Sequence, residues 1–155
     1  MSKLSLEQGL YKAATYCSRS EHCSHEVREK LFAWDVAPEA HDPIIDRLIS
    51  EKFLDDNRFG WSYINDKYKY RRWGRIKIHH HLRAKGLHTQ QINELLTEVI
   101  DPDTYDENLR HVLTEKQRST RANSSYELKG KLVRFACSRG YEPDCVYRII
   151  DELLQ

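Results

Sequence analysis

Residues 78–100 read IHHHLRAKGLHTQQINELLTEVI, and residues 132–154 read LVRFACSRGYEPDCVYRIIDELL. Each stretch places apolar residues at the spacing of one helix face, then a glycine, then apolar residues at helix spacing again. The matching positions are Ile78, Leu82, Gly86, Ile92, Leu95, Leu96 and Ile100 in the first, and Leu132, Ala136, Gly140, Val146, Ile149, Ile150 and Leu154 in the second. Glycine at this place is typical of the left-handed residue that ends a helix. Both stretches therefore predict the same helix–cap–helix unit.

A third, less regular copy lies near the N-terminus. Its first half has Asp35 at the place of the glycine, and its second half follows a four-residue insertion that contains Pro38. The matching positions are Val27, Leu31 and Asp35, then Ile45, Leu48, Ile49 and Phe53. One more helical stretch precedes each copy, at residues 6–19, 56–73 and 105–118. The pattern predicts three tandem three-helix repeats at residues 1–54, 55–100 and 101–155, the central one basic.

The predicted fold class is all-α, because no stretch alternates apolar and polar residues as a strand does. A repeat of about 50 residues buries little apolar surface alone, so we expect the three repeats to stack into an elongated or curved body. Such bodies suit extended partners. Helix starts are marked by two capping-box pairs and three prolines: Ser5 with Gln8, Ser124 with Glu127, Asp42-Pro43, Asp101-Pro102 and Pro143.

The composition excludes several classes of protein. The 155 residues are 39% hydrophobic and 32% charged, and no apolar run approaches the roughly 20 residues of a membrane-spanning helix. Residues 1–5 lack the apolar core of a secretory signal. Three Trp, nine Tyr and four Phe argue against a disordered chain. We expect a cytoplasmic monomer without a membrane partner.

Charge is segregated along the chain although Lys and Arg (25) nearly balance Asp and Glu (24). Residues 67–85 contain eight basic residues and no acidic one, and residues 110–139 contain eight basic and two acidic ones. Residues 35–56 hold seven acidic residues and two basic ones. Such polarity suits a polyanion or an acidic protein surface, although a biased, solvated helix face gives the same pattern.

Motifs of catalysis are missing. The sequence has no glycine-rich phosphate loop, no Gly-x-Ser-x-Gly and no His-Glu-x-x-His, so we expect neither an enzyme nor a cofactor. Cys17, His22, Cys23 and His25 lie close together, but their spacing fits no standard zinc finger and no second ligand pair follows. We predict no metal site. A metal-dependent function of these four residues stays as a minor alternative.

The candidate binding residues are cations in two patches. The central patch is Arg71, Arg72, Arg75, Lys77, Arg83 and Lys85, and the second patch is Lys131, Arg134 and Arg139. Arg75, His79 and Arg83 recur at steps of four on one helix face. These cations could follow a phosphate backbone, with Tyr68, Tyr70 or Trp73 stacking on bases, or dock on acidic loops of a protein. The tyrosines and Trp73 could equally pack between helices.

Several of these residues form motifs that resemble the RecX family. The motifs are Asp55-Asp56-Asn57-Arg58-Phe59, then Gly74-x3-Ile78-x3-Leu82-x-x-Lys85-Gly86-Leu87, with weaker matches at Glu26-Val27-Arg28-x-Lys30-Leu31 and Lys131-Leu132-x-Arg134-Phe135-x3-Arg139-Gly140-Tyr141. The similarity spans residues 6–154. Gly60 stands where the family commonly has Ala, and Asp35 stands where the other repeats have Gly.

The resemblance implies a regulator of the RecA recombinase. RecX proteins are helical, carry three tandem three-helix repeats, and bind in the groove of the RecA–single-stranded DNA filament. They block filament growth and thereby restrain the ATPase, strand-exchange and co-protease activities of RecA. The expected partners are the RecA filament and single-stranded DNA, contacted directly or through the filament. The alternative is a stand-alone module that binds single- or double-stranded nucleic acid.

Overall fold

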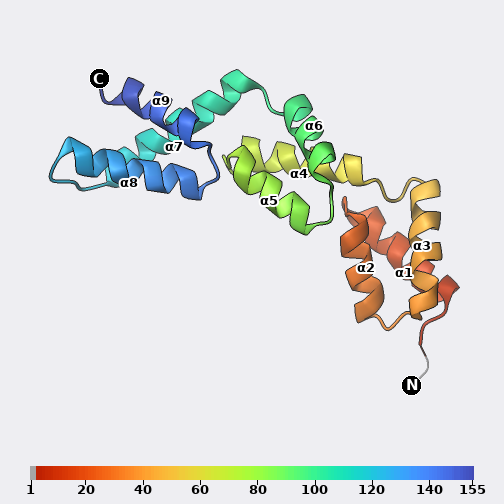
Figure 1. Ribbon diagram of the computed structural model, residues 1–155. Helices are drawn as coiled ribbons and strands as arrows, with labels where there is room; N and C mark the ends of the chain where they lie inside the picture. Colours follow the sequence, from red (N-terminus) through yellow and green to blue (C-terminus); the bar gives the residue numbers. More distant parts are fainter. Residues whose placement is uncertain (1–2) are drawn as a thin grey trace. The chain divides into compact units, whose positions relative to one another are not determined.

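The computed structural model describes residues 3–155, which form nine α-helices and no strand beyond an isolated bridge between Leu4 and Val36 (Figure 1). The helices are α1 (Leu6–Arg19), α2 (Ser24–Ala33), α3 (Pro38–Ser50), α4 (Asp56–Lys69), α5 (Arg75–Ala84), α6 (Thr89–Val99), α7 (Pro102–Ser119), α8 (Ser125–Ser138) and α9 (Pro143–Leu153). The all-α prediction is confirmed. No helix within the described residues is long and apolar enough to cross a membrane.

Most helices begin where the sequence predicted. Ser5 and Gln8 form the reciprocal capping box of α1, since the Ser5 side chain accepts from the Gln8 backbone N–H and the Gln8 side chain accepts from the Ser5 N–H. Asp101 accepts from the Thr104 N–H at 2.9 Å at the start of α7. The Ser124 hydroxyl accepts from the Glu127 N–H at 3.1 Å at the start of α8. These side chains satisfy backbone donors that the first helical turn leaves free.

The expected start at Asp42-Pro43 is wrong. Helix α3 begins at Pro38, with Ala37 as its N-cap, and Pro43 lies inside the helix. Pro38 supplies the proline that the first turn favours, so the helix starts before Asp42 is reached. Pro43 removes one backbone hydrogen bond near the N-terminal end. The apolar face of α3, with Ile44 and Leu48 fully buried, compensates for that loss.

The three residues at equivalent cap positions all adopt positive φ. The angles are +57° at Asp35, +90° at Gly86 and +95° at Gly140. Glycine reaches this region without strain, and Asp tolerates it better than most other residues. The internal repeat seen in the sequence therefore corresponds to a repeated backbone conformation.

The chain divides into two compact units. The first takes the residues up to Ser62 together with Ala84–Leu87, and the second takes Tyr63–Arg83 and His88–Gln155. The division runs through α4. The sequence boundaries expected at 54/55 and 100/101 instead fall between α3 and α4 and between α6 and α7.

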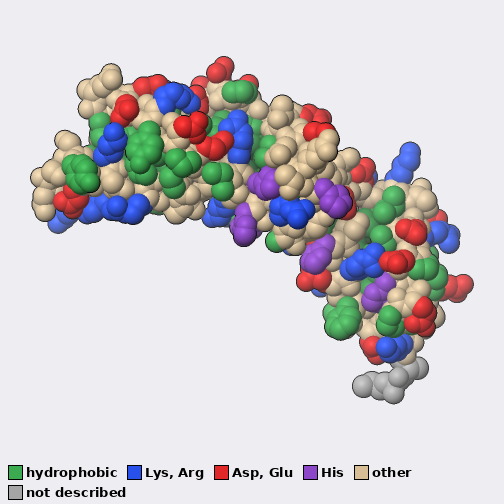
Figure 2. All heavy atoms as spheres, in the orientation of Figure 1, with side chains coloured by type: hydrophobic (Ala, Val, Ile, Leu, Met, Phe, Trp, Pro, Cys, Tyr) green, Lys and Arg blue, Asp and Glu red, His purple; other side chains and the backbone are tan. Residues whose placement is uncertain are grey.

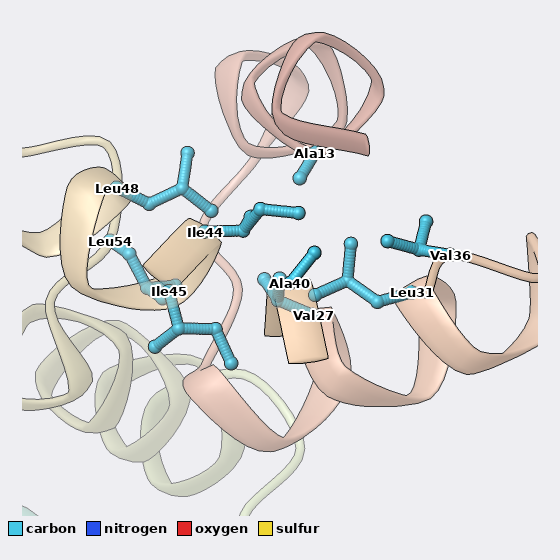
Figure 3. Packing of buried hydrophobic residues seen from close by; sticks show 9 residues of the cluster. All are labelled: Ala13, Val27, Leu31, Val36, Ala40, Ile44, Ile45, Leu48 and Leu54. Atoms are coloured by element: carbon cyan, nitrogen blue, oxygen red, sulfur yellow. The ribbon is translucent and has the colours of Figure 1, made fainter. Parts of the chain in front are cut away.

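The core of the first unit lies between α1, α2 and α3. Figure 3 shows the side chains of this core facing one another from the three helices and from the segments that follow α2 and α3. They are Ala13, Val27, Leu31, Val36, Ala40, Ile44, Ile45, Leu48 and Leu54. Of the repeat positions read from the sequence, Val27, Leu31, Ile45 and Leu48 are buried here, whereas Ile49 and Phe53 are exposed. The buried set supplies the hydrophobic stabilisation of the unit.

The second unit buries one apolar face of each helix from α5 to α9. Its fully buried residues include Ile78 and Leu82 of α5, and two tyrosines, Tyr105 and Tyr141, whose rings lie 5.1 Å apart. Tyr68 is also buried, whereas Tyr70 is 69% exposed. The packing alternative for the central aromatics therefore holds for Tyr68 and not for Tyr70.

Candidate polyanion interface

The loop between α4 and α5 places Arg71 and Arg72 of the predicted central patch beside Arg139 of the second patch. The backbone carbonyl of Arg71 accepts a hydrogen bond from the guanidinium of Arg139, and the carbonyl of Arg72 accepts from the Tyr141 hydroxyl at 2.8 Å. Arg72 itself has φ +53°, so the loop turns sharply at this residue. Arg72 of the central patch and Arg139 of the second patch therefore lie in one site within the second unit.

Two backbone hydrogen bonds hold α5 against the turn between α8 and α9. The Gly74 N–H donates to the Arg139 carbonyl at 2.8 Å, and the Ile76 N–H donates to the Gly140 carbonyl at 2.9 Å. Both donors belong to the start of α5, where the helix leaves its own N–H groups without partners. The turn therefore serves as the cap of α5 and fixes the position of Arg139.

A groove runs between α7 and α8, and we call it the α7–α8 groove. It consists of two adjoining hollows of about 390 and 620 Å³ that share Lys116, Ser119 and Phe135. Its lining residues are Arg72, His111, Val112, Glu115, Lys116, Ser119, Thr120, Arg121, Lys131, Arg134, Phe135 and Arg139. In Figure 2, Lys and Arg side chains gather along the lower edge of the part of the chain that contains α8.

The charge of the α7–α8 groove is strongly positive. Six of its lining residues are Lys or Arg, and Glu115 is the single carboxylate among them. Glu115 pairs with Arg118 at 2.8 Å, outside the lining. Lys131 pairs with Glu127 at 3.1 Å and also donates to the Arg121 carbonyl at 2.8 Å, which holds the loop after α7 to α8. The groove is therefore complementary to an anionic polymer.

An aromatic ring lies among these cations. The Lys116 Nζ lies 4.6 Å from the centre of the Phe135 ring, and the Arg139 Cζ lies 6.0 Å from it. The Arg139 Nε is buried and has no hydrogen-bond partner among the residues that the structure describes. A buried donor without a partner is rare in folded proteins, and an anionic oxygen is a ligand that would satisfy it.

Three of the predicted central cations interact with acidic or aromatic side chains of the protein itself. Arg75 pairs with Glu142 at 3.0 Å, and its guanidinium lies 3.9 Å from the centre of the Tyr105 ring. The Lys77 Nζ lies 4.2 Å from the Trp73 ring. Lys85 pairs with Glu26 at 3.0 Å within the first unit. Arg75 and Lys85 thus hold helices together.

Burial and hydrogen bonding shift the pKa values of the groups in and beside these ion pairs. Burial, assisted by the hydrogen bond to Glu142, raises the pKa of the Tyr105 hydroxyl well above its usual value. Burial opposes ionisation of Glu26, yet hydrogen bonds from Lys85 and from the Cys23 N–H hold the pKa of Glu26 below its usual value. The side-chain hydrogen bond to Glu26 raises the pKa of Lys85. Both partners are therefore charged at neutral pH.

The cationic face that the sequence predicted on α5 borders a second hollow, separate from the α7–α8 groove. Arg75, His79 and Arg83 all line it. The hollow has a volume of about 440 Å³, and its other lining residues are Ile76, His80, Asn93 and Leu96. Ile76 is 52% exposed, so this hollow is more apolar in character than the α7–α8 groove. The backbone carbonyl of Arg71 lies beside the α7–α8 groove, where it accepts a hydrogen bond from Arg139, and the Arg71 side chain is exposed.

Sequence reasoning missed Lys116 and Arg121 as site residues. The excess of basic residues over 110–139 was the signal that could have identified them. Their contribution depends on α7 packing beside α8, which places them opposite Lys131 and Arg134. Phe135 of the third-repeat motif is half-buried and lines the groove.

The residues weighed as metal ligands, Cys17, His22, Cys23 and His25, belong to the first unit. His22 stacks on Tyr16 with ring centres 3.7 Å apart and contacts Glu26 at 3.2 Å, while the buried Cys23 thiol donates to the Lys85 carbonyl. Burial raises the pKa of both Cys17 and Cys23 to about 11. Within residues 3–155, no three His, Cys, Asp or Glu side chains are arranged to hold a metal ion.

Family models match the chain in three consecutive segments. They are described as the first, second and third three-helix domains of RecX and match residues 10–48, 55–96 and 103–150. The chain is 32% identical over 144 residues to the regulatory protein RecX of Clostridium tetani, covering 92% of this chain and 65% of that one. It is 35% identical over 123 residues to the regulatory protein RecX of Pelodictyon phaeoclathratiforme, covering 78% of this chain and 73% of that one.

Solved structures share the fold. The crystal structure of RecX from Lactobacillus salivarius superposes with a TM-score of 0.85 at 22% identity, covering 96% of both chains. A second crystal structure, of a regulatory protein RecX, gives a TM-score of 0.83 at 22% identity, covering 95% of this chain and 73% of the other.

Proposed function

The chain belongs to the RecX family of regulatory proteins, and we propose that it binds the groove of the RecA–single-stranded DNA filament and inhibits filament extension. In this proposal the protein catalyses nothing itself. It acts in the cytoplasm as a monomer and lowers the ATPase, strand-exchange and co-protease activities of RecA by limiting the filament that performs them.

The observation that carries the proposal is the α7–α8 groove. It presents six cations against one carboxylate, and a nucleoprotein filament exposes both phosphates and acidic side chains. Charge complementarity of this kind speeds encounter and fixes orientation more than it adds affinity. A cationic groove on a small helical protein therefore suits a partner that offers the same anionic surface repeatedly along its length.

The ATPase of RecA on single-stranded DNA tests the proposal. The protein is added well below the concentration of RecA, with RecA from the same organism. We expect inhibition at substoichiometric ratios, because one molecule that stops extension removes many downstream protomers from the filament. Absence of inhibition at equimolar protein would overturn the proposal.

The groove also favours one other function, a stand-alone module that binds nucleic acid. Such a module would inhibit RecA only by competing for DNA, so inhibition would appear only when the protein saturates the DNA sites. A titration at two DNA concentrations separates the two functions. With a competitor for DNA, the inhibitory concentration follows the amount of DNA, and with a filament inhibitor it follows the amount of RecA.

A further inference from the structure

We propose that Ser119 is a phosphorylation site and that its phosphate occupies the α7–α8 groove and blocks it. This inference rests on the proposed function, because it assigns a regulation to the same groove. Ser119 lies in the last turn of α7 and lines both hollows of the groove. The modifying enzyme would be a serine/threonine kinase that selects basic residues beside its acceptor, with ATP as the phosphoryl donor.

Ser119 is the more accessible of the two hydroxyl groups in the groove lining. Its side chain is exposed, and its hydroxyl donates to the Lys116 carbonyl across 3.2 Å, which is a long hydrogen bond. The Thr120 hydroxyl donates to the same carbonyl at 2.5 Å in a part-buried position. The Ser119 oxygen is therefore the one that can turn outwards to meet an enzyme.

The chain around Ser119 has features that a kinase selects. Residues 120–124 are non-helical, and the side chains of residues 121–126 are all exposed, so the segment is open to an active site. Arg118 directly precedes Ser119, and Arg121 follows two residues later. Kinases discriminate their substrates by such charge patterns.

The modification is an in-line phosphoryl transfer. The Ser119 Oγ attacks the γ-phosphorus of ATP, and a bond forms between these two atoms. The bond from that phosphorus to the oxygen that bridges it to the β-phosphate breaks, and ADP leaves with the electron pair. The hydroxyl proton passes to a carboxylate of the kinase. The phosphoserine carries a charge of about −1.5 to −2 at pH 7.

The groove offers this phosphate a cationic cluster. The larger of its two hollows is lined by Lys116, Arg121, Lys131 and Arg134. A phosphate opposite such a cluster accepts charge-assisted hydrogen bonds, whereas the dipole at a helix C-terminus repels it. The dipole amounts to only about half an elementary charge, so the four cations outweigh it. We therefore expect the phosphate to dock between α7 and α8.

A docked phosphate would remove the complementarity of the groove to an anionic filament. The lining carries six Lys and Arg residues against one carboxylate, and the phosphate cancels about two of the six charges. It also repels the anions of the filament from the same place. Phosphorylation should therefore weaken the inhibition of RecA, and removal of the phosphate should restore it.

Ser18 provides a matched control in the same chain. It lies in the last turn of α1, is exposed, and donates its hydroxyl to the Thr15 carbonyl, three residues before it. An arginine, Arg19, is also adjacent to it in the sequence. A phosphate at either serine meets the dipole of a helix C-terminus. Ser18 does not line the α7–α8 groove, so only the phosphate on Ser119 has this cationic cluster opposite it.

Full-length protein with genetically encoded phosphoserine at position 119 or at position 18 tests the docking. The second pKa of an exposed phosphoserine is about 6. Phosphorus NMR titration should place it about one unit lower at position 119 than at position 18, because nearby cations favour the more charged form. The melting temperature should fall by about 1–3 °C for position 18 only. Equal pKa values at the two positions would overturn the inference.

Titrations of the RecA ATPase test the regulation. Phosphoserine at position 119 should raise the half-inhibitory concentration roughly tenfold or more, and phosphoserine at position 18 should leave it within about twofold. Phosphatase treatment should restore the native value. Undiminished inhibition with position 119 phosphorylated would overturn the inference and leave the proposed function standing. If the unmodified protein does not inhibit RecA, the proposed function and this regulation fall together, whereas the NMR comparison still judges the docking.

Peptide mass spectrometry of the protein isolated from its own cells, growing and after DNA damage, tests whether the site is used. We expect phosphate on the peptide that contains Ser119. The signal should vanish in the Ser119→Ala variant and persist in the Thr120→Val variant. Absence of phosphate at Ser119 under both conditions would overturn the inference.

Discussion

Gly74 lies so close to Gly140 that a Cβ atom added at position 74 would come within 2.2 Å of the Gly140 carbonyl oxygen. In the other direction, a Cβ atom on Gly140 would lie 2.3 Å from the Lys77 Cβ. The two backbones therefore touch without any side chain between them. This close approach permits the hydrogen bond from Gly74 to Arg139 and so places Arg139 in the groove.

The first unit contains an equivalent contact built differently. By the internal repeat, Cys23 corresponds to Gly74 and Lys85 corresponds to Arg139. The Cys23 thiol reaches the Lys85 carbonyl at 3.6 Å, where the Gly74 N–H reaches the Arg139 carbonyl at 2.8 Å. The ion pair between Lys85 and Glu26 adds a side-chain contact there. The same junction is thus made once by backbone atoms and once by side chains.

Replacing Gly74 by Ala should strongly destabilise the protein. The added methyl group has no space, because the nearest atoms belong to backbone and cannot rotate away. We expect a loss of about 3 kcal/mol or more in the free energy of unfolding. Urea denaturation measures it. Gly130→Ala is the matched control, because its Cβ would meet only the flexible Arg134 side chain at 3.4 Å. That change should be neutral or stabilise α8 by up to about 1 kcal/mol. A Gly74→Ala protein as stable as the native one would contradict the close approach.

Replacing Tyr105 by Phe should destabilise the second unit without changing its shape. The Tyr105 hydroxyl accepts from the Arg75 N–H at 2.9 Å and donates to Glu142. Its removal leaves a donor and a carboxylate oxygen unsatisfied in a part-buried site, at a cost of about 1–3 kcal/mol. Thermal and urea unfolding followed by circular dichroism measure the loss. Tyr147→Phe, at a position that is 47% exposed, provides the comparison and should change stability by less than about 0.5 kcal/mol.

Replacing Glu26 by Gln should lower stability in a manner that depends on pH. Because folding lowers the pKa of Glu26 below 4.5, its charge stabilises the native state above that pH, and the contribution disappears as the pH falls through the lowered value. We expect the variant to be about 1 kcal/mol less stable at neutral pH and to approach the native protein near pH 3. Urea midpoints across this range measure the difference. A constant difference at every pH would show that the ion pair with Lys85 contributes nothing.

Local signals were enough to predict most helix starts and the repeat, although the stretch expected to be helical over residues 56–73 ends at Lys69. Ser5, Asp101 and Ser124 mark helix starts because each hydroxyl or carboxylate binds an N–H only three residues away. The prediction at Pro43 was wrong because a proline in the sequence does not show whether it starts a helix or lies within one. The burial of the α3 apolar face, which decides this, depends on tertiary packing. The repeat is visible in sequence because Gly86 and Gly140 are needed at the same backbone turn.

The site could be predicted only in part, because its contacts join distant residues. Arg75 and Glu142 are 67 positions apart, so nothing in the basic stretch shows that this arginine is paired. The sequence also does not show that Lys116 and Arg121 line the groove, because they do so only through the packing of α7 beside α8. Charge density indicated the regions of the chain from which the cations of the groove come. The division between structural and available cations depends on packing that composition does not encode.

Reversing charge at Arg134 and at Arg75 should separate binding from stability. Arg134 is exposed and lines the α7–α8 groove, so Arg134→Glu places a carboxylate among the cations that we propose face the anionic filament. We expect its half-inhibitory concentration against RecA ATPase to rise roughly tenfold or more, while its melting temperature stays near the native value. Arg75→Glu instead sets two carboxylates against each other at Glu142 and removes the cation above Tyr105.

The Arg75→Glu variant should therefore lose about 3 kcal/mol of stability. Thermal melts and ATPase titrations of both variants at one salt concentration check the separation. Refolded Arg75→Glu protein that remains native at low temperature should inhibit nearly normally, because Arg75 does not line the groove. If Arg75→Glu abolished inhibition with an unchanged melt, the hollow on α5 would be the binding surface in place of the α7–α8 groove. A stable Arg134→Glu protein with native inhibition would show that the α7–α8 groove is not the binding surface, since Arg134 is one of the exposed cations of the groove.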